Sequence, residues 1–190
     1  RDRYLVLRNT STSMSADEIH QLGLAQINYY HRQLDSALLS MGYQEGTLLD
    51  RMQQTIHHNP YTQLDDSAIS SEVAQKYGDY FTQAAAQLQE QFHELPDTAV
   101  VAEQIPAYKS KASHRAYYSP PPISNKRPGI VYFNLRDIRS QAFTNTATLA
   151  YHEGIPGHHT QYAISRSLTE LPTFRRFNRN SAYMEGWAQY

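Results

Sequence analysis

The chain has 190 residues, of which 40% are hydrophobic and 18% charged, and its net charge is −1 with histidine neutral. This length suits one domain or a part of a larger protein, and the apolar content is sufficient for a packed core. The nearly balanced charge argues against a nucleic-acid-binding protein, which usually carries a basic excess on one face. No apolar run approaches the roughly 20 residues that span a bilayer, so no transmembrane segment is expected.

Cysteine is absent, which excludes disulfide bonds and thiolate metal ligands. Any zinc site must therefore use histidine and carboxylate side chains. The sequence shows no signal peptide at Arg1, and it reaches Tyr190 within a helical pattern. We therefore expect the chain to be a fragment of a larger protein.

Three helices are predicted in the first half of the chain, over residues 15–42, 47–57 and 68–93. Ser15 and Glu18 have the spacing of a capping box, in which each side chain bonds the backbone N–H of the other. Apolar residues follow at helical spacing as far as Gly42, a natural helix end. We assign residues 1–98 to a helical scaffold.

Three short strands are predicted in the middle of the chain, over residues 100–105, 115–118 and 130–134. Three prolines end the second strand, and Pro128-Gly129 forms a turn before the third. Helix returns near Asn145, and a last helix begins near Ser181. The pattern predicts a mostly helical α+β fold with a small antiparallel or mixed sheet, in which residues 99–190 continue the same domain.

Three of the nine histidines lie in the segment 152–159, HEGIPGHH. In the common zinc-peptidase motif, two histidines four residues apart on one helix face bind Zn²⁺, and a glutamate follows the first. Here Pro156 stands four residues after His152 and cannot bind a metal. The common motif is therefore absent, although its residue types are present.

A regular helix would not bring these histidines together. His158 would lie about 600° around the axis from His152, and His159 would lie roughly 10.5 Å along it. Pro156 clashes with the carbonyl of His152, and Gly157 tolerates a positive φ. We therefore predict a break at this Pro-Gly pair that returns His158 to His152, with His159 as the weaker alternative ligand.

A third metal ligand is expected from a following helix. Glu185 lies 27 residues after His158, and Trp187 beside it could shield a site from solvent. Two histidines and one glutamate leave a fourth position for water, as in catalytic zinc sites. Glu153 matches the general base of such sites. The sequence thus predicts a Zn²⁺ site formed by His152, His158 and Glu185.

The histidine cluster and Glu185 also have simpler explanations that involve no metal. The histidine cluster could be a solvated helix face, and Glu185 could be an acid that interacts with the dipole at a helix start. His-Glu pairs also occur by chance. We assign no function to the pair His93-Glu94, which has no second histidine before His114.

The segments 152–161, HEGIPGHHTQ, and 185–188, EGWA, together resemble a bacterial family of zincin-like proteins, catalogued as domain-of-unknown-function family 885 (DUF885). Residues 15–42 resemble its N-terminal helix, and Tyr117-Tyr118 with 129–134 resemble its sheet. The resemblance implies a gluzincin-type fold and sequence missing at both ends. Many members are described as secreted proteins or lipoproteins, which implies an extracytoplasmic location.

A zinc metallopeptidase that acts on a peptide or small-molecule substrate is the function these features predict. The alternatives are an inactive zincin-like peptide-binding module, a zinc amidase or esterase acting on non-peptide substrates, and a purely structural helical domain. Residues 131–134 are the candidate to pair with an extended substrate, and a plain core strand is the alternative. Tyr117 or Tyr118 could donate to an oxyanion, although packing is favoured for both. Oligomeric state and cleavage specificity stay open.

Overall fold

The computed structural model describes residues 2–92, 95, 98–122, 127–140 and 146–190. It is mostly helical with one three-stranded sheet, which confirms the predicted α+β class. No described helix is both long enough and apolar enough to cross a membrane. The chain divides into two compact units, Arg1–Thr62 with Arg139–Thr144, and Gln63–Ile138 with Asn145–Tyr190. The predicted division at residue 98 falls inside the second unit and stays a prediction.

The first unit is helical. Its helices are α1 (Asp2–Thr10), α2 (Ala16–Ser40) and α3 (Leu48–Ile56). The predicted capping box is present, since Glu18 N–H donates to Ser15 Oγ and Ser15 N–H donates to the Glu18 carboxylate. A second capping box, formed by Thr47 and Asp50, begins α3. Although α2 carries the predicted apolar pattern, Leu38 is its only described residue that is buried.

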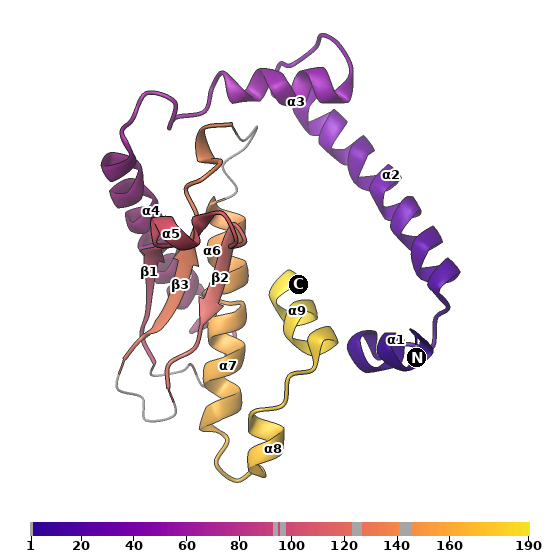
Figure 1. Ribbon diagram of the computed structural model, residues 1–190, viewed down its shortest axis with the longest axis vertical. Coiled ribbons are helices and arrows are strands. Elements are labelled where there is room, and N and C mark those ends of the chain that lie inside the picture. The colour runs from indigo at the N-terminus through magenta and orange to yellow at the C-terminus, as the bar shows by residue number, and fades with distance from the viewer. Residues whose placement is uncertain (1, 93–94, 96–97, 123–126, 141–145) are drawn as a thin grey trace. The chain divides into compact units, whose positions relative to one another are not determined.

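The second unit contains the sheet and the remaining helices (Figure 1). Its elements are α4 (Asp66–Leu88), β1 (Val100–Gln104), α5 (Ala107–Ser110), β2 (Ala116–Ser119), β3 (Gly129–Phe133), α6 (Thr146–Glu153), α7 (His158–Ser167), α8 (Thr173–Arg176) and α9 (Ser181–Gln189). A 3₁₀ turn, η1 (Ile138–Ser140), follows β3. The last helix begins at Ser181, as predicted. His93, Glu94 and Asn145 lie outside the described residues.

The sheet is mixed, with the strand order β1-β3-β2. β1 runs parallel to β3, whereas β2 runs antiparallel to it. Because β3 is paired on both sides, the prediction that residues 131–134 offer an edge to an extended substrate is wrong. The apolar run identified the strand, but strand order depends on partners that are distant in the sequence.

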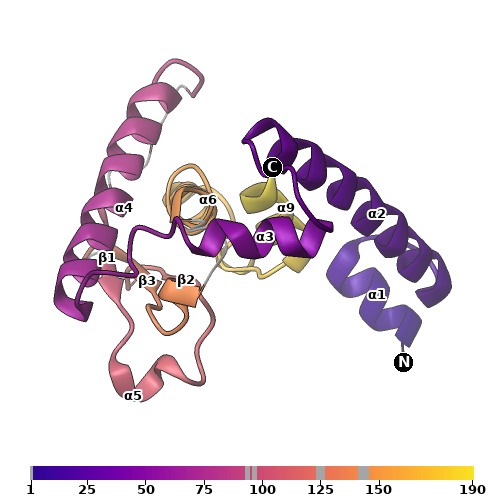
Figure 2. The same ribbon diagram turned by 90° about the horizontal axis from the view of Figure 1, so that it is seen from above.

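α4 and α6 contact each other, and they also contact the edge strands β1 and β2 respectively; in Figure 2 α6 is seen end-on and α4 runs across the view. α4 buries a stripe of residues at helical spacing, namely Ile69, Val73, Tyr77, Phe81, Ala84 and Leu88. The Tyr77 ring stacks on Phe133 of β3 at 5.5 Å, and Ala150 of α6 is fully buried. Each large apolar side chain buried in this way contributes about 1.5–3 kcal/mol. This core fixes α6, whose last turn carries His152 and Glu153.

Candidate metal centre

The histidine motif is broken where the sequence predicts a break. α6 ends at Glu153 and α7 begins at His158, and the Ile155–Pro156 peptide bond between them is cis. The N–H of Gly157 bonds the carbonyl of Tyr151 at 2.9 Å, which spans six residues in place of the usual four. The bend therefore absorbs the two residues by which this motif exceeds the common one.

At Gly157 the backbone passes too close to the carbonyl group of His152 to leave room for a side chain. A Cβ at this position would lie 1.9 Å from the carbonyl oxygen of His152. Its φ is −72°, so the bend does not use the positive φ that glycine tolerates. Gly154 is also closely packed, since a Cβ there would lie 2.2 Å from a ring carbon of Phe81. The two glycines let the chain turn sharply between the histidines.

The bend brings the predicted ligand residues together. The Nε2 atom of His152 lies 3.6 Å from Oε2 of Glu185, and the Nε2 atom of His158 lies 3.7 Å from it. One ligand atom from each of the three residues lies within 4.8 Å of the others. Glu185 comes from the separate helix α9, as expected. Their role as metal ligands stays a prediction.

This donor set fits zinc. Two imidazole nitrogens and one carboxylate oxygen are ligands that catalytic zinc sites use. His158 is buried and His152 is half-buried. Burial lowers the pKa of His158, which favours the neutral ring that a metal requires. The side chain of Glu185 is 62% exposed.

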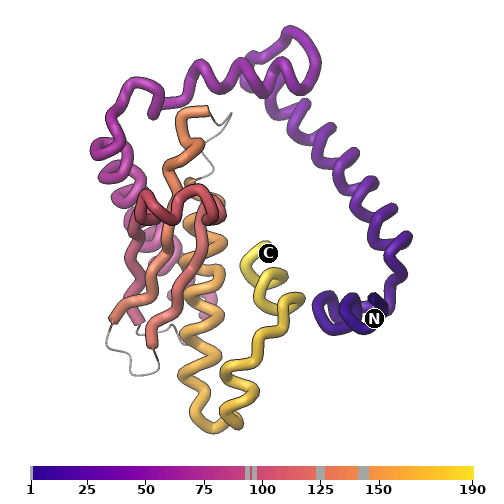
Figure 3. The backbone as a smooth tube through the Cα atoms, in the orientation of Figure 1, coloured from indigo at the N-terminus to yellow at the C-terminus, as the bar shows by residue number. Residues whose placement is uncertain are grey.

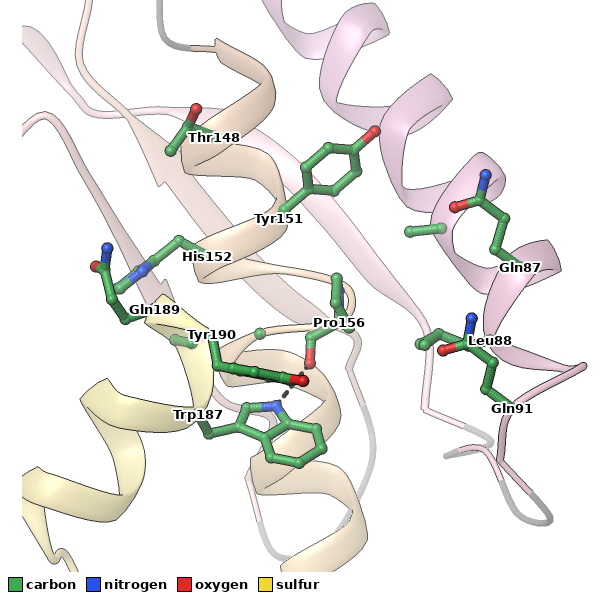
Figure 4. A pocket seen from close by; sticks show the side chains of 13 residues that line it. Gln87, Leu88, Gln91, Thr148, Tyr151, His152, Pro156, Trp187, Gln189 and Tyr190 are labelled. Atoms are coloured by element: carbon green, nitrogen blue, oxygen red, sulfur yellow. Dashed lines mark hydrogen bonds between the residues drawn. The ribbon is translucent and has the colours of Figure 1, made fainter. Parts of the chain in front are cut away.

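α9 is attached to the bend by Trp187. Its indole Nε1 donates a hydrogen bond to the carbonyl oxygen of Pro156 at 2.8 Å (Figure 4). Asn180 caps the start of the helix by accepting from the N–H of Tyr183. From α7 the chain passes through α8 and returns to α9 beside the motif (Figure 3). This return places Glu185 near histidines that are 27 or more residues earlier in the sequence.

Glu153 is buried next to His152. Burial raises the pKa of its carboxyl group, while the charge of His152 and a hydrogen bond from the Tyr118 backbone act in the opposite direction. The carboxylate is therefore more basic than an exposed glutamate would be, as suits a general base. It comes from the same turn as His152 and is held by the edge strand β2.

His159 does not join the three ligand residues. It is fully buried, and its Nε2 lies 2.8 Å from the carbonyl oxygen of Thr98. A carbonyl only accepts, so Nε2 carries the proton, and Nδ1 accepts from the hydroxyl of Tyr118 at 3.0 Å. Gly129 leaves room for this contact, because a Cβ there would lie 2.8 Å from Nδ1. His159 therefore ties β2 and Thr98 to the start of α7, and the Tyr118 hydroxyl is used in that contact.

A cavity of about 440 Å³ opens beside His152 (Figure 4). Its walls come from α4, α6, the bend and α9, with Leu88, Tyr151, Pro156 and Trp187 among them. The described lining contains no carboxylate, lysine or arginine. Sequence reasoning did not identify the α4 side of this cavity, because Leu88 is more than 60 residues from the motif and belongs to an ordinary apolar stripe.

The chain is similar to a known structure of a longer protein. The crystal structure described as that of "the putative lipoprotein from Colwellia psychrerythraea" has 31% sequence identity to it and a TM-score of 0.87. The similarity covers 96% of this chain and 31% of that chain, so this chain spans about a third of the relative. No curated protein matches it. The family of bacterial proteins of unknown function called DUF885 matches residues 3–190, and the chain therefore belongs to the DUF885 family.

Proposed function

We propose that this chain carries the catalytic centre of a zinc-dependent hydrolase, a zincin-like enzyme of the gluzincin type that cleaves peptide bonds. One observation carries the proposal: two histidines from the two sides of a bend meet a glutamate from a separate helix, within 4.8 Å. A buried glutamate follows the first histidine directly. This combination supplies three ligands and a base, which is the minimum set for such chemistry.

His152, His158 and Glu185 would hold the metal. Zinc in such a site lowers the pKa of water and polarises the substrate carbonyl. Glu153 accepts a proton from the attacking water and delivers it to the leaving amine. The raised pKa of this carboxyl group supports both steps, because a base closer to neutrality takes up and releases a proton more readily.

The substrate would lie between the cavity and the sheet edge. The uncharged cavity beside His152 has room for an apolar or aromatic side chain. β2 lies at an edge of the described sheet and contacts α6, so an extended peptide can pair with β2 in place of the central strand β3.

A zinc amidase or esterase is the second candidate, because the metal and the base would serve an ester or a non-peptide amide equally well. The buried Glu153 argues against an inactive peptide-binding module, which needs no base. A purely structural domain likewise needs no buried carboxylate beside the histidines, because burying one costs free energy that hydrogen bonds must offset. We further propose an extracytoplasmic location, in keeping with the lipoprotein description of the Colwellia relative.

The test combines metal analysis with turnover in the full-length protein. We expect one zinc per chain, and hydrolysis of a fluorogenic peptide library that chelation abolishes and added zinc restores. Parallel assays with aryl esters and non-peptide amides distinguish the second candidate. Stoichiometric zinc without hydrolysis of any of these substrates would contradict the enzymatic proposal, and a protein that binds no zinc would contradict the site itself.

A further inference from the structure

A second cavity, of about 180 Å³, lies at the opposite end of α7 from the histidines. It is bounded by the end of α7, by α8 and by the proline loop after β2, with Arg166, Arg176, Phe177 and Pro121 in its lining. Its volume suits a small ion or a single functional group.

The two arginines at this cavity have no acidic partner among the described residues. Arg166 donates to the carbonyl oxygen of Pro121, and Arg176 donates to the carbonyl oxygen of Arg166. The Nε atoms of both side chains are buried, and neither has a hydrogen-bond partner within the described structure. Glu170, the carboxylate nearest in sequence, is exposed. Two guanidinium groups therefore line one cavity without a compensating negative charge among the described residues.

The arginines are held in place by an aromatic ring. The guanidinium carbons of Arg166 and Arg176 lie 5.4 Å and 5.6 Å from the centroid of the Phe177 ring. Arg166 also lies 5.7 Å from the centroid of the Tyr162 ring. Cation–π contacts at these distances stabilise the charged side chains and limit their freedom to turn into solvent. The site is thus organised before any ligand arrives.

Like charges that are held together at a partly buried site repel each other unless an anion is bound between them. Guanidinium groups match the geometry of carboxylate and phosphate oxygens, to which they donate paired hydrogen bonds. The surrounding sequence adds to the positive potential, since residues 165–179 contain four arginines and one glutamate. We propose that the cavity between α7 and α8 is a binding site for a small oxyanion, held by Arg166 and Arg176 and separate from the metal centre.

The experiment measures anion binding to the full-length protein by calorimetry. Sodium phosphate and sodium acetate are titrated separately into protein in chloride buffer of equal ionic strength. Both titrations are repeated after chelation, because an oxyanion bound by zinc is lost with the metal whereas one bound by the arginines persists. We expect saturable binding of at least one of the two oxyanions to the chelated protein. The stronger of the two identifies the ligand as a phosphate or a carboxylate.

Arg166→Gln and Arg176→Gln should each weaken this binding by about tenfold or more, as the loss of a charge-assisted hydrogen bond predicts. Arg175→Gln is the matched control, because Arg175 is an exposed neighbour on α8 and carries the same charge. Arg176→Lys keeps the charge and removes the paired donors, so it tests the geometry if a glutamine variant fails to fold. The proposal would be overturned if neither oxyanion bound measurably in the chloride buffer. An equal loss of oxyanion affinity in Arg175→Gln would also overturn it.

Discussion

The indole Nε1 of Trp187 donates to the carbonyl oxygen of Pro156 at 2.8 Å, and this bond joins the helix that carries Glu185 to the bend between the two histidines. The bond therefore links the helix of the third predicted ligand to the turn between the other two. Because outer contacts of this kind orient metal ligands, their loss typically reduces metal affinity by 10–100-fold.

Trp187→Phe should keep the fold and lower zinc affinity by roughly that factor of 10–100. The change removes the donor and leaves most of the ring, so packing against Phe92 is largely retained. Competition with a chromogenic chelator measures the affinity. Tyr183→Phe, on the exposed side of the same helix, is the control and should bind zinc as the wild type does. Equal affinity in all three proteins would show that the bond does not position Glu185.

His152→Ala and Glu185→Ala should each abolish stoichiometric zinc binding, since two ligands do not hold a zinc ion tightly. Elemental analysis of the purified full-length proteins measures this. Glu170→Ala removes an exposed carboxylate in the same unit and should leave the zinc content unchanged. Retention of zinc by both ligand variants would refute the assignment.

Glu153→Gln should retain zinc and lose activity by a factor of about 10²–10⁴, the usual contribution of acid–base catalysis. The amide is close in size to the carboxylate but does not accept the proton. Zinc content and turnover are measured on the same sample. Loss of zinc would instead make Glu153 a ligand, and unchanged turnover would remove its catalytic role.

Gly157→Ala should disrupt the bend, because the new Cβ would lie 1.9 Å from the carbonyl oxygen of His152. We expect a lower melting temperature and the loss of tight zinc binding. Gly186→Ala is the matched control, since a Cβ there would have no neighbour within 4 Å although Gly186 adjoins Glu185. Wild-type zinc affinity in Gly157→Ala would show that the close approach is not required.

The capping box of α2 predicts a dependence on pH. Backbone and side-chain hydrogen bonds from Ser15 lower the pKa of Glu18 below 4.5. A lowered carboxyl pKa stabilises the folded state above the unfolded pKa, and this stabilisation is lost as the pH falls through the folded pKa. Ser15→Ala should therefore be less stable than the wild type at pH 7, with a smaller difference well below pH 4.5. Urea unfolding measures this, and Ser13→Ala, two residues earlier, should show no such trend.

The local sequence determined where several helices, a strand and the bend between the histidines occur. The Pro-Gly pair made a regular helix impossible between His152 and His158, and the bend occurs there because proline and glycine act on the backbone next to them. The capping box at Ser15 and the last helix from Ser181 follow from equally local patterns. The apolar run after Gly129 likewise identified a strand without any knowledge of its partners.

Only the tertiary structure decided the strand order and which side chains meet at the candidate site. The central position of β3 depends on which strands pair beside it, and strand order is not encoded in the alternation of a single strand. His158 and His159 both follow the same bend, and their surroundings differ because Thr98 and the Tyr118 hydroxyl engage His159. Glu185 reaches the histidines because α9 returns to contact α6 and α7. The convergence of side chains from separate elements is a property of packing, which fixes distances that spacing along the chain leaves undetermined.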